Sequence, residues 1–532
     1  MAVNMLTPKA LFSCMLTIEV LFFLFKFLLR SLSNVHSSVQ KRFWFTHDLQ
    51  PKLHKYSSLS IKADYLLNET LVFHMEEALL KSSSLFPYFM LVAFEAGGLL
   101  RAILLFVAYP LCCFFSKEMR TKIMVFICFF GIKRDRFRVG RSVLPKFFLE
   151  DVGYEGFEII MRHKRKVGVS DLPIVMVEGF LKDYLGVDFV MGREMKVAYG
   201  YFVGFMEERK NSNSFLNEIT GEEKINSLVG YHSLGTTFSQ HFFSHCKEIY
   251  LVTRAEKRKW HILPRDKYPR RLIFHDGRLA FRPTFSATFL MFLWFPFGLF
   301  LCIIRATAAL FLPYGIALPI LAFTGIKGTM SMYHTPSDKK SRGTLFVCNH
   351  RTLLDPIYVS MALMKPVTAV TYSLSRISEM LSPIRTVRLM RDRKNDLRRM
   401  NEMLCQGDVV VCAEGTTCRE PYLLRFSPLF AELTDDIVPV ALDMQVSMFY
   451  GTTASGLKCL DPLFFLMNPF PTCMIKFLER LPASYTCGSG GKSRYEVANY
   501  VQCEIGKALG YECTSLTRKD KYMILAGNEG VI

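Results

Sequence analysis

The sequence predicts an α/β protein with two α/β units joined by a membrane-embedded helical segment. Two observations carry this prediction. Short apolar stretches of strand length alternate with helical patterns in both halves of the chain. Between the halves lie two long intervals without a charged residue. The chain has 532 residues. Because one hydrophobic core stops growing well below that length, we expect two or more domains.

Residues 1–40 are predicted to form a hydrophobic anchor or targeting segment. The run Ala10–Leu29 is strongly apolar, but it contains Glu19 and Lys26, and no small-residue cleavage site follows it. This pattern argues against a cleaved signal peptide. A signal anchor and an interfacial helix both stay open, while the low arginine content disfavours a transit peptide.

Residues 41–280 are predicted to form the first α/β unit, with a helix over Ile174–Leu185. The strand candidates are Thr70–Met75, Leu228–Tyr231 and Ile249–Thr253. The apolar stretch Met90–Phe115 carries two charges, Glu95 and Arg101. We expect it to be buried against protein or to lie at the membrane interface rather than in lipid.

Residues 281–328 are predicted to enter the membrane. No charged residue lies between Arg282 and Arg305, or between Arg305 and Lys327, and each interval approaches the length that spans a bilayer. Prolines interrupt both intervals, so two kinked spans and a hairpin that enters and leaves by one face both stay open. A buried helical hairpin of a soluble protein is disfavoured because Phe285–Ile304 is apolar on every side.

Residues 329–532 are predicted to form the second α/β unit. A crossover helix is expected over Arg393–Cys405 and a further helix over Arg494–Ala508, after a glycine-rich loop at Gly488–Gly491. The predicted strands are Leu345–Cys348, Val367–Tyr372, Thr386–Met390, Val409–Cys412 and Ile437–Leu442.

Charge and cysteine content narrow the function classes. Lys and Arg outnumber Asp and Glu by 66 to 47, for a net charge of +19, yet only 21% of residues are charged. The basic residues are scattered among Phe-rich segments without a nucleic-acid-binding module, so anionic substrates and membrane surfaces are the expected partners, and nucleic acid is not. The fifteen cysteines contain no CxxC pair, which indicates reduced thiols and neither a disulfide framework nor a metal site. No cofactor is expected.

A candidate general base follows the strand Leu345–Cys348. His350 lies just past the strand end, and Asp355 lies five residues further on. If a helix starts between them, the carboxylate can return to the imidazole and fix its tautomer. The other ring nitrogen is then free to take a proton from a hydroxyl.

Two further strand ends add an acid and guanidinium groups. Val409–Cys412 leads into a loop with Glu414, Gly415 and Arg419, and Thr386–Met390 leads to Arg391. The ends of parallel strands meet at one edge of a sheet, and guanidinium groups match phosphate oxygens geometrically. The sequence therefore predicts a pocket for a hydroxylated phosphate ester beside the base.

These motifs resemble a known family. Asn349-His350-x4-Asp355, Glu414-Gly415-Thr416 and Val438-Pro439-Val440 look like the ordered blocks of glycerolipid acyltransferases. The variant Glu-Gly-Thr-Thr-Cys-Arg that ends at Arg419 is similar to that of land-plant glycerol-3-phosphate acyltransferases, whose members acylate the sn-2 hydroxyl from acyl-CoA. Two departures stand out: Ala413 replaces the usual proline, and Arg419 lies two residues later than in bacterial-type members.

The resemblance implies roles for individual residues. His350 would be the general base and Asp355 its orienting partner. The substrate-binding residues would be Asn349, Arg391, Glu414, Gly415, Thr416 and Arg419. The implied substrates are acyl-CoA and glycerol 3-phosphate, with membrane lipid as surroundings. The endoplasmic reticulum is the expected location, with the mitochondrion as the alternative. A lysophospholipid acyltransferase and a catalytically silent membrane scaffold are the competing functions.

The resemblance also implies a haloacid-dehalogenase-like fold for residues 41–280, with altered phosphatase motifs. Where active relatives have Asp-x-Asp-Gly-Thr, this chain has His74, Glu76 and then Glu77-Ala78. Where they bind magnesium through Gly-Asp-x3-Asp, it has Thr236 and Gln240. An imidazole replaces the ester-forming carboxylate, and magnesium loses its ligands. We therefore expect acyl transfer without phosphatase activity.

Overall fold

The computed structural model describes residues 52–55, 69–207, 228–233, 246, 248–332, 342–371 and 379–529. The chain divides into residues 1–52 and 53–532. The predicted N-terminal run Ala10–Leu29 lies outside the described residues, as do Thr236 and Gln240.

The first sheet has six strands in the order β1-β8-β7-β2-β3-β4. Its strands are β1 (Lys52–Lys55), β2 (Thr70–His74), β3 (Arg165–Pro173), β4 (Phe189–Arg193), β7 (Leu228–Ser233) and β8 (Glu248–Val252). All five residues of β2 are buried between its parallel neighbours β3 and β7, as the continuous apolar run predicts for a central parallel strand. The three predicted strands of this half are confirmed within a residue or two, and β1, β3 and β4 are additions.

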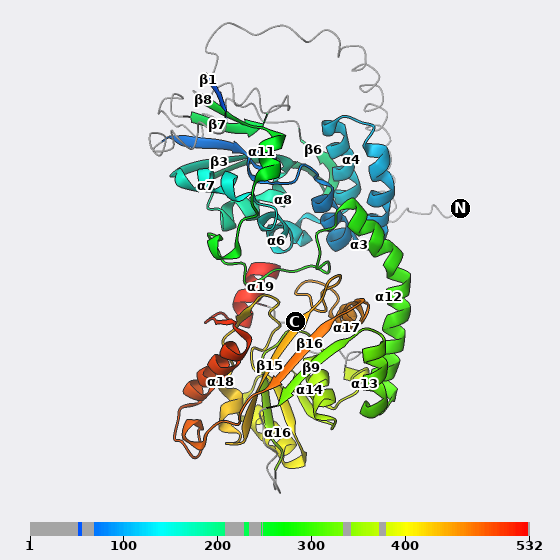
Figure 1. Cartoon of the computed structure of the whole chain (residues 1–532), viewed down its shortest axis with the longest axis vertical. Helices are drawn as coiled ribbons and strands as arrows, with labels where there is room; N and C mark the ends of the chain where they lie inside the picture. The colour runs from blue at the N-terminus through cyan, green and yellow to red at the C-terminus, as the bar shows by residue number, and fades with distance from the viewer. Residues whose placement is uncertain are drawn as a thin grey trace, which may run out of the picture. The chain divides into compact units, whose positions relative to one another are not determined.

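Most helices of this unit lie below the first sheet and to its right in Figure 1. The helices are α3 (Phe86–Cys112), α4 (Lys117–Phe129), α5 (Val139–Ser142), α6 (Leu144–Leu149), α7 (Tyr154–Arg162), α8 (Ile174–Glu178) and α11 (Arg254–Lys259). The predicted helix Ile174–Leu185 is realised as α8 followed by a π-helical turn over Gly179–Tyr184. A small hairpin of β5 (Met195–Ala198) and β6 (Tyr201–Met206) packs against α4.

The second sheet has seven strands in the order β12-β11-β13-β10-β15-β16-β9. They are β9 (Lys327–Met332), β10 (Leu345–Cys348), β11 (Thr368–Thr371), β12 (Thr386–Arg388), β13 (Val409–Cys412), β15 (Ile437–Gln445) and β16 (Thr472–Phe477). The central strand β10 lies between parallel β13 and β15, so these three strands end at the same edge. All five predicted strands are confirmed within a few residues, while β9 and β16 are additions.

The second sheet is covered by helices and one short ribbon. The helices are α14 (Asp355–Leu363), α16 (Arg393–Gln406), α17 (Asp461–Leu466), α18 (Arg494–Leu509) and α19 (Arg518–Ala526), and β14 (Tyr422–Leu423) pairs with β17 (Glu512–Cys513). Two of these helices, α16 and α18, match the predicted helices closely.

The apolar central segment forms α12 (Phe285–Phe311) and α13 (Tyr314–Phe323). By length and composition α12 could cross a membrane. The ten residues of α13 span only about 15 Å, too short to cross one, so this geometry favours the hairpin alternative over two spans. Arg305 of α12 is fully buried and donates to the backbone carbonyls of Leu466 and Asn468, both at 2.6 Å, which fastens α12 to the second unit.

By length and composition the helix α3 could also cross a membrane, yet it is not straight. Gly98 has a left-handed φ of 78° inside it, and the rings of Phe86 and Tyr109 lie 4.4 Å apart. In a straight helix these residues would be about 34 Å apart. The chain therefore reverses at Gly98, and each arm of α3 is too short to cross a bilayer.

Candidate active site

The site lies where β10, β13 and β15 end. Asn349 follows β10 and is fully buried. Its side-chain amide donates to the carbonyl of Leu442 at 2.9 Å, and its Oδ1 accepts from the Leu442 backbone N–H at 2.8 Å. Asn349 thus joins the end of β10 to β15 and fixes the position of the next residue, His350.

The next turn of chain holds the histidine and the carboxylate together. His350 Nδ1 lies 2.9 Å from Asp355 Oδ2. Asp355 is fully buried at the start of α14, and it also accepts from the backbone N–H groups of Arg351 and Thr352 and from the Thr352 hydroxyl. These donors hold the carboxylate in one orientation, so Nδ1 of His350 carries the proton and Nε2 is left to accept one.

The ring of His350 is flanked by sulfur as well as carboxylate. Burial lowers the pKa of His350, but the hydrogen-bonding contact with the Cys412 sulfur and the hydrogen bond to the Asp355 carboxylate raise it, and the net pKa lies above the ordinary value of 6.5. The pKa of Cys412 is itself raised by its hydrogen-bonding contact with Cys348, 3.5 Å away, and by burial. Cys412 is therefore a neutral thiol at physiological pH, which leaves Asp355 as the anion that stabilises a charged imidazole.

Glu414 occupies the loop after β13 and faces the protein. Its Oε1 accepts from the backbone N–H of His350 at 2.7 Å, and its Oε2 accepts from that of Leu424 at 2.8 Å. Burial raises the pKa of Glu414 to about 7. With both oxygens engaged, Glu414 holds the His350 backbone in place rather than facing a ligand.

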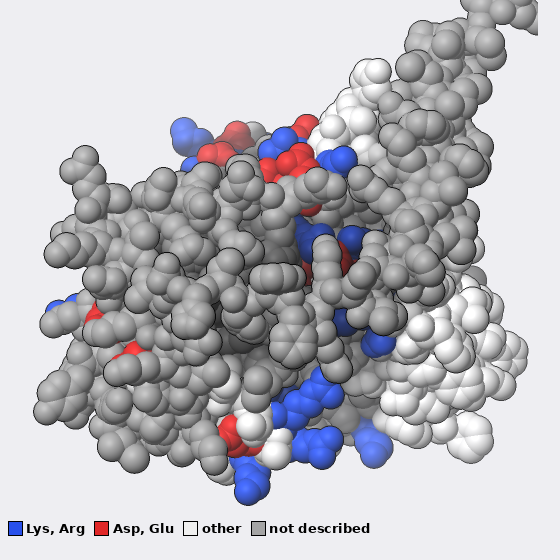
Figure 2. All heavy atoms as spheres, turned by 90° about the horizontal axis from the view of Figure 1, so that it is seen from above, with Lys and Arg blue, Asp and Glu red and all other residues white. Residues whose placement is uncertain are grey.

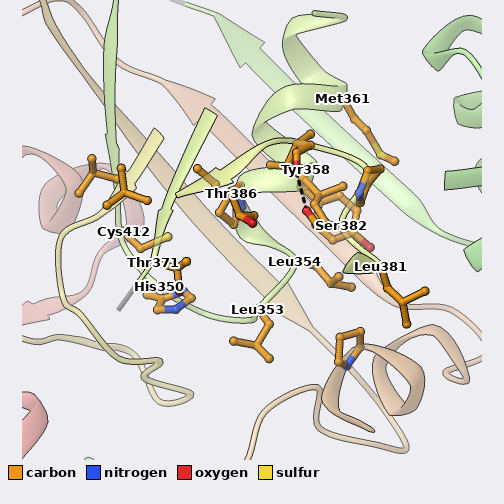
Figure 3. A pocket seen from close by; sticks show the side chains of 18 of the residues that line it. His350, Leu353, Leu354, Tyr358, Met361, Thr371, Leu381, Ser382, Thr386 and Cys412 are labelled. Carbon is orange, nitrogen blue, oxygen red and sulfur yellow. Dashed lines mark hydrogen bonds between the residues drawn. The ribbon is translucent and has the colours of Figure 1, made fainter. Parts of the chain in front are cut away.

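A cavity of about 390 Å³ extends from His350, a size typical of ligand sites. Figure 3 shows His350, Thr371 and Cys412 on one side of it, with Met361 and Leu381 on the other. The remaining wall is mainly apolar and reaches the membrane segment through Ala306 and Ala309 of α12 and Leu321 of α13. Gly415, with a φ of 67°, borders the cavity near His350. The cavity can hold an apolar chain with one end at the imidazole.

The two predicted phosphate-binding arginines do not line this cavity. Arg391 is exposed after β12 and has a left-handed φ of 64°. Arg419 is 7% exposed; it donates to the Thr452 carbonyl and packs over the ring of Tyr450 at 4.2 Å. Thr416 is buried, and its hydroxyl lies 3.4 Å from Lys521 Nζ. The structure brings His350, Asp355, Glu414 and Gly415 together, whereas Arg391 and Arg419 are not among the residues that line the cavity.

Comparisons with known proteins agree with this geometry. Residues 70–252 match the family model described as the HAD-like domain of RAM2-like glycerol-3-phosphate acyltransferases, and residues 332–443 match the acyltransferase model. A probable glycerol-3-phosphate acyltransferase 3 of Arabidopsis thaliana is 54% identical over 91% of this chain and 94% of its own length. The chain belongs to the plant glycerol-3-phosphate acyltransferase family.

More distant proteins were found as well. The glycerol-3-phosphate acyltransferase RAM2 of Petunia hybrida is 43% identical over 86% of this chain and 97% of its own length. Among solved structures, the 1-acyl-sn-glycerophosphate acyltransferase PlsC from Thermotoga maritima covers 42% of this chain and 88% of its own, at 15% identity and a TM-score of 0.26.

The HAD-like domain of this family member has a buried polar cluster at the end of β2. His74 is fully buried; its Nδ1 lies 3.2 Å from Glu76 Oε2, and its Nε2 lies 3.7 Å from Asp171 Oδ2. Glu76 also accepts from the hydroxyl of Ser170, and its backbone carbonyl accepts from Lys257 Nζ at 2.9 Å. Burial lowers the pKa of His74, but the carboxylates of Glu76 and Asp171 outweigh it and raise that pKa.

One group of side chains is close enough to hold a metal ion within the described ranges: His350, Asp355 and Cys412, whose donor atoms lie within 4.8 Å of one another. The Asp355 oxygens already accept from Arg351 and Thr352, so ligation would cost those bonds. Acyl transfer to a hydroxyl by a His–Asp pair needs no metal.

Three residues of the acyltransferase site were missed by the sequence analysis. Arg351 donates to the carbonyls of Cys418 and Glu420, both at 2.7 Å, and anchors the loop after Glu414. Thr352 orients Asp355, and the Thr-x-x-Asp spacing of a capping box could have revealed it. Cys412 belongs to the predicted strand Val409–Cys412, and no local pattern marks its contact with His350.

Proposed function

We propose that this chain transfers an acyl group from acyl-CoA to the sn-2 hydroxyl of glycerol 3-phosphate and releases lysophosphatidic acid. The observation that carries the proposal is the His350–Asp355 pair at the wall of the apolar cavity. The names of the relatives and the acyltransferase model support the reaction class. The donor and the sn-2 position follow from the resemblance of the Glu414–Arg419 motif.

His350 acts as the general base in this mechanism. Its Nε2 takes the proton from the acceptor hydroxyl while the hydroxyl oxygen attacks the thioester carbonyl carbon of acyl-CoA. The tetrahedral intermediate collapses with loss of the CoA sulfur, which receives the proton back from the imidazolium. Asp355 stabilises the imidazolium and keeps Nδ1 protonated throughout. No covalent acyl-enzyme is needed.

The acyl chain occupies the cavity that leads from His350 toward α12 and α13. Its mainly apolar wall supports this placement, and so does its contact with the segment proposed to enter the membrane. Long-chain acyl-CoA partitions at the bilayer surface, so a binding cavity open toward membrane helices shortens the path of the substrate.

Arg391 and Arg419 are proposed as the residues that bind the acceptor phosphate, with Asn349, Glu414, Gly415 and Thr416 shaping the pocket. Arg391 is exposed at a strand end and has a left-handed backbone conformation. Both support a role in phosphate binding, since residues with strained backbone are concentrated at functional sites. Arg419 would have to turn away from Thr452 and Tyr450 to reach a phosphate. A KM for glycerol 3-phosphate that rises in Arg391→Gln supports this role, and an unchanged KM contradicts it.

We propose that the HAD-like domain has no phosphatase activity. A phosphoaspartyl mechanism needs a carboxylate nucleophile that also binds a divalent cation. His74 stands at that position, and its ring is held between Glu76 and Asp171. The expected product therefore keeps its phosphate.

The proposed organisation is an N-terminal anchor in residues 1–40, the HAD-like domain in 41–280, the membrane segment in 281–328 and the acyltransferase domain in 329–532. α12 supports attachment to a membrane. The endoplasmic reticulum is the proposed location, with the mitochondrion as the alternative.

The test uses purified full-length protein, labelled glycerol 3-phosphate and acyl-CoA, followed by separation of the lipids. Lysophosphatidic acid labelled at the glycerol is the expected product. Monoacylglycerol without an added phosphatase would contradict the absence of phosphatase activity. Acylation of added lysophosphatidic acid but not of glycerol 3-phosphate would show the competing lysophospholipid acyltransferase function.

A further inference from the structure

The second arm of α3, after the reversal at Gly98, is apolar on two opposite faces. One face packs inward through Ala102 and Leu105, which are fully buried. The other face exposes four large side chains between 57% and 84%: Leu100, Leu104, Val107 and Leu111; Phe114, in the turn after α3, is 87% exposed. The spacing of the four helical side chains, at intervals of four, three and four residues, places them in one stripe. A contiguous exposed stripe of this kind marks an interaction surface.

The stripe is continuous with the apolar surface of α12. Phe106 stacks on Phe285 with ring centroids 4.6 Å apart, and it also contacts Phe289 and Phe292. The arm therefore lies beside the first part of α12, whose outward side chains, such as Leu293, are also exposed. On the side where Figure 1 draws α3 and α12, the described surface in Figure 2 is a broad area without charged side chains, bordered by Lys and Arg.

A basic segment lies at the Gly98 end of this arm. Residues 133–141 hold Lys133 and four arginines against a single acid, Asp135. The arginines are Arg134, Arg136, Arg138 and Arg141. Four of the five basic side chains are exposed, and within the described part of the chain none of the five has a carboxylate partner at ion-pair distance. Charges left unpaired in this way are available to an anionic surface.

Two contacts fix the basic segment against the arm. The guanidinium of Arg101 donates to the carbonyls of Cys128 and Phe130, both at 2.8 Å, and so joins the arm to the end of α4 just before the segment. The backbone N–H of Arg134 donates to the carbonyl of Gly200 in the β5–β6 turn. That turn carries Tyr199, which is 78% exposed. Aromatic side chains beside basic ones are typical of the level of lipid headgroups.

A cavity of about 750 Å³ is lined by the reversal at Gly98, by Lys133, Arg136 and Arg138, and by residues of the second α/β unit such as Thr453. The exposed apolar stripe thus matches the hydrocarbon edge of a bilayer, the exposed tyrosine its interface and the basic segment its phosphates.

We propose that the HAD-like domain docks on an anionic lipid surface, with the second arm of α3 in the plane of the interface and residues 133–141 against lipid phosphates. Charge complementarity and continuity with α12 select lipid over a second copy of this chain, whose matching surface would carry the same positive charge. The proposal assigns the domain a function other than catalysis. The proposal depends on the proposed function at one point only. The continuity of the two apolar surfaces argues for lipid only if α12 itself is attached to a membrane.

The test places a photoreactive benzoylphenylalanine at position 104 of the full-length protein, reconstituted in vesicles of phosphatidylcholine alone or mixed with phosphatidylserine. The matched control carries the same group in place of Ile262, which is also 57% exposed but lies next to the charged segment 254–259 of the same domain. We expect lipid cross-linking at 104 to exceed that at 262 and to increase with phosphatidylserine.

A second variant removes two charges, Arg134→Gln with Arg136→Gln. At about five-fold per basic residue, the ratio of docked to undocked domain should fall about 25-fold. Equal lipid cross-linking at 104 and 262, cross-linking of 104 to another copy of the chain, or no dependence on phosphatidylserine and these arginines would overturn the proposal.

Two further measurements keep this test separate from the proposed function. Acyl transfer by the position-104 variant shows that the protein is folded. The same photoreactive group in place of Leu293 reports insertion of α12 independently. Lipid cross-linking at 293 without cross-linking at 104 overturns the docking of the HAD-like domain and leaves the attachment through α12 intact.

Discussion

Replacing Asp355 by Asn tests whether the carboxylate makes His350 a base. The side chain is fully buried and accepts hydrogen bonds from His350, Arg351 and Thr352. An amide has one acceptor oxygen instead of two, so its NH2 group must face at least one of these donors. Asp355→Asn therefore removes the charge-assisted bond to His350 and disturbs the tautomer that leaves Nε2 free.

The expected magnitude follows from that one bond. A hydrogen bond to a charged group contributes about 1.5–3 kcal/mol. If the His350–Asp355 bond reaches this strength only when the imidazolium forms, its loss lowers kcat roughly 10- to 150-fold. The pH profile should move as well. His350 must be neutral to accept a proton, so activity rises with pH through its raised pKa. Without the carboxylate that pKa falls, and the rising limb shifts to lower pH.

The assay measures acyl transfer to glycerol 3-phosphate between acidic and alkaline pH in washed membranes. A matched control is Asp520→Asn, because Asp520 lies in the first turn of α19 and accepts from the N–H and hydroxyl of Thr517 much as Asp355 does from Thr352. The control should keep wild-type kcat. An unchanged kcat and pH profile in Asp355→Asn would refute the role of the carboxylate.

Three further predictions concern the cavity, the buried arginine and the membrane segment. Ala309→Phe fills the far end of the cavity and should lower kcat/KM for long acyl-CoA more than for short; a chain-length series with an unchanged ratio would contradict this. Arg305→Met leaves the carbonyls it binds unpaired and should destabilise the protein by about 3 kcal/mol or more, seen as a lower Tm in detergent; the exposed control Arg398→Met should not change Tm, and equal Tm values for both variants would count against the buried bonds. A chain lacking residues 1–30 should resist alkaline carbonate extraction because α12 remains; its release would show that α12 is not the anchor.

Much of the second unit could be predicted because its strands are local patterns. Leu345–Cys348 and Val409–Cys412 are short apolar runs that each follow a polar residue, and both form strands with those limits. Parallel strands ending at one edge then explain why His350 and Glu414 meet. The pairing of His350 with Asp355 was predictable from their spacing of five residues. A helix that starts after His350 turns the chain back, so that the carboxylate can reach the imidazole.

The rest depends on contacts between distant residues. The reversal of α3 rests on Gly98, whose left-handed φ a sequence pattern does not distinguish from an ordinary helical glycine. The orientation of Arg419 is set by Thr452 and Tyr450, far along the chain. The engagement of both Glu414 oxygens depends on Leu424, which looks like a simple core residue.

The central claim is that His350 is the base that activates the acceptor hydroxyl. The most direct measurement compares wild-type and His350→Ala protein, purified in parallel, for incorporation of labelled glycerol 3-phosphate into lysophosphatidic acid with saturating acyl-CoA. Removing the base should lower the rate by about 10²–10⁴ and leave folding and membrane attachment unchanged. Wild-type turnover by His350→Ala would contradict it.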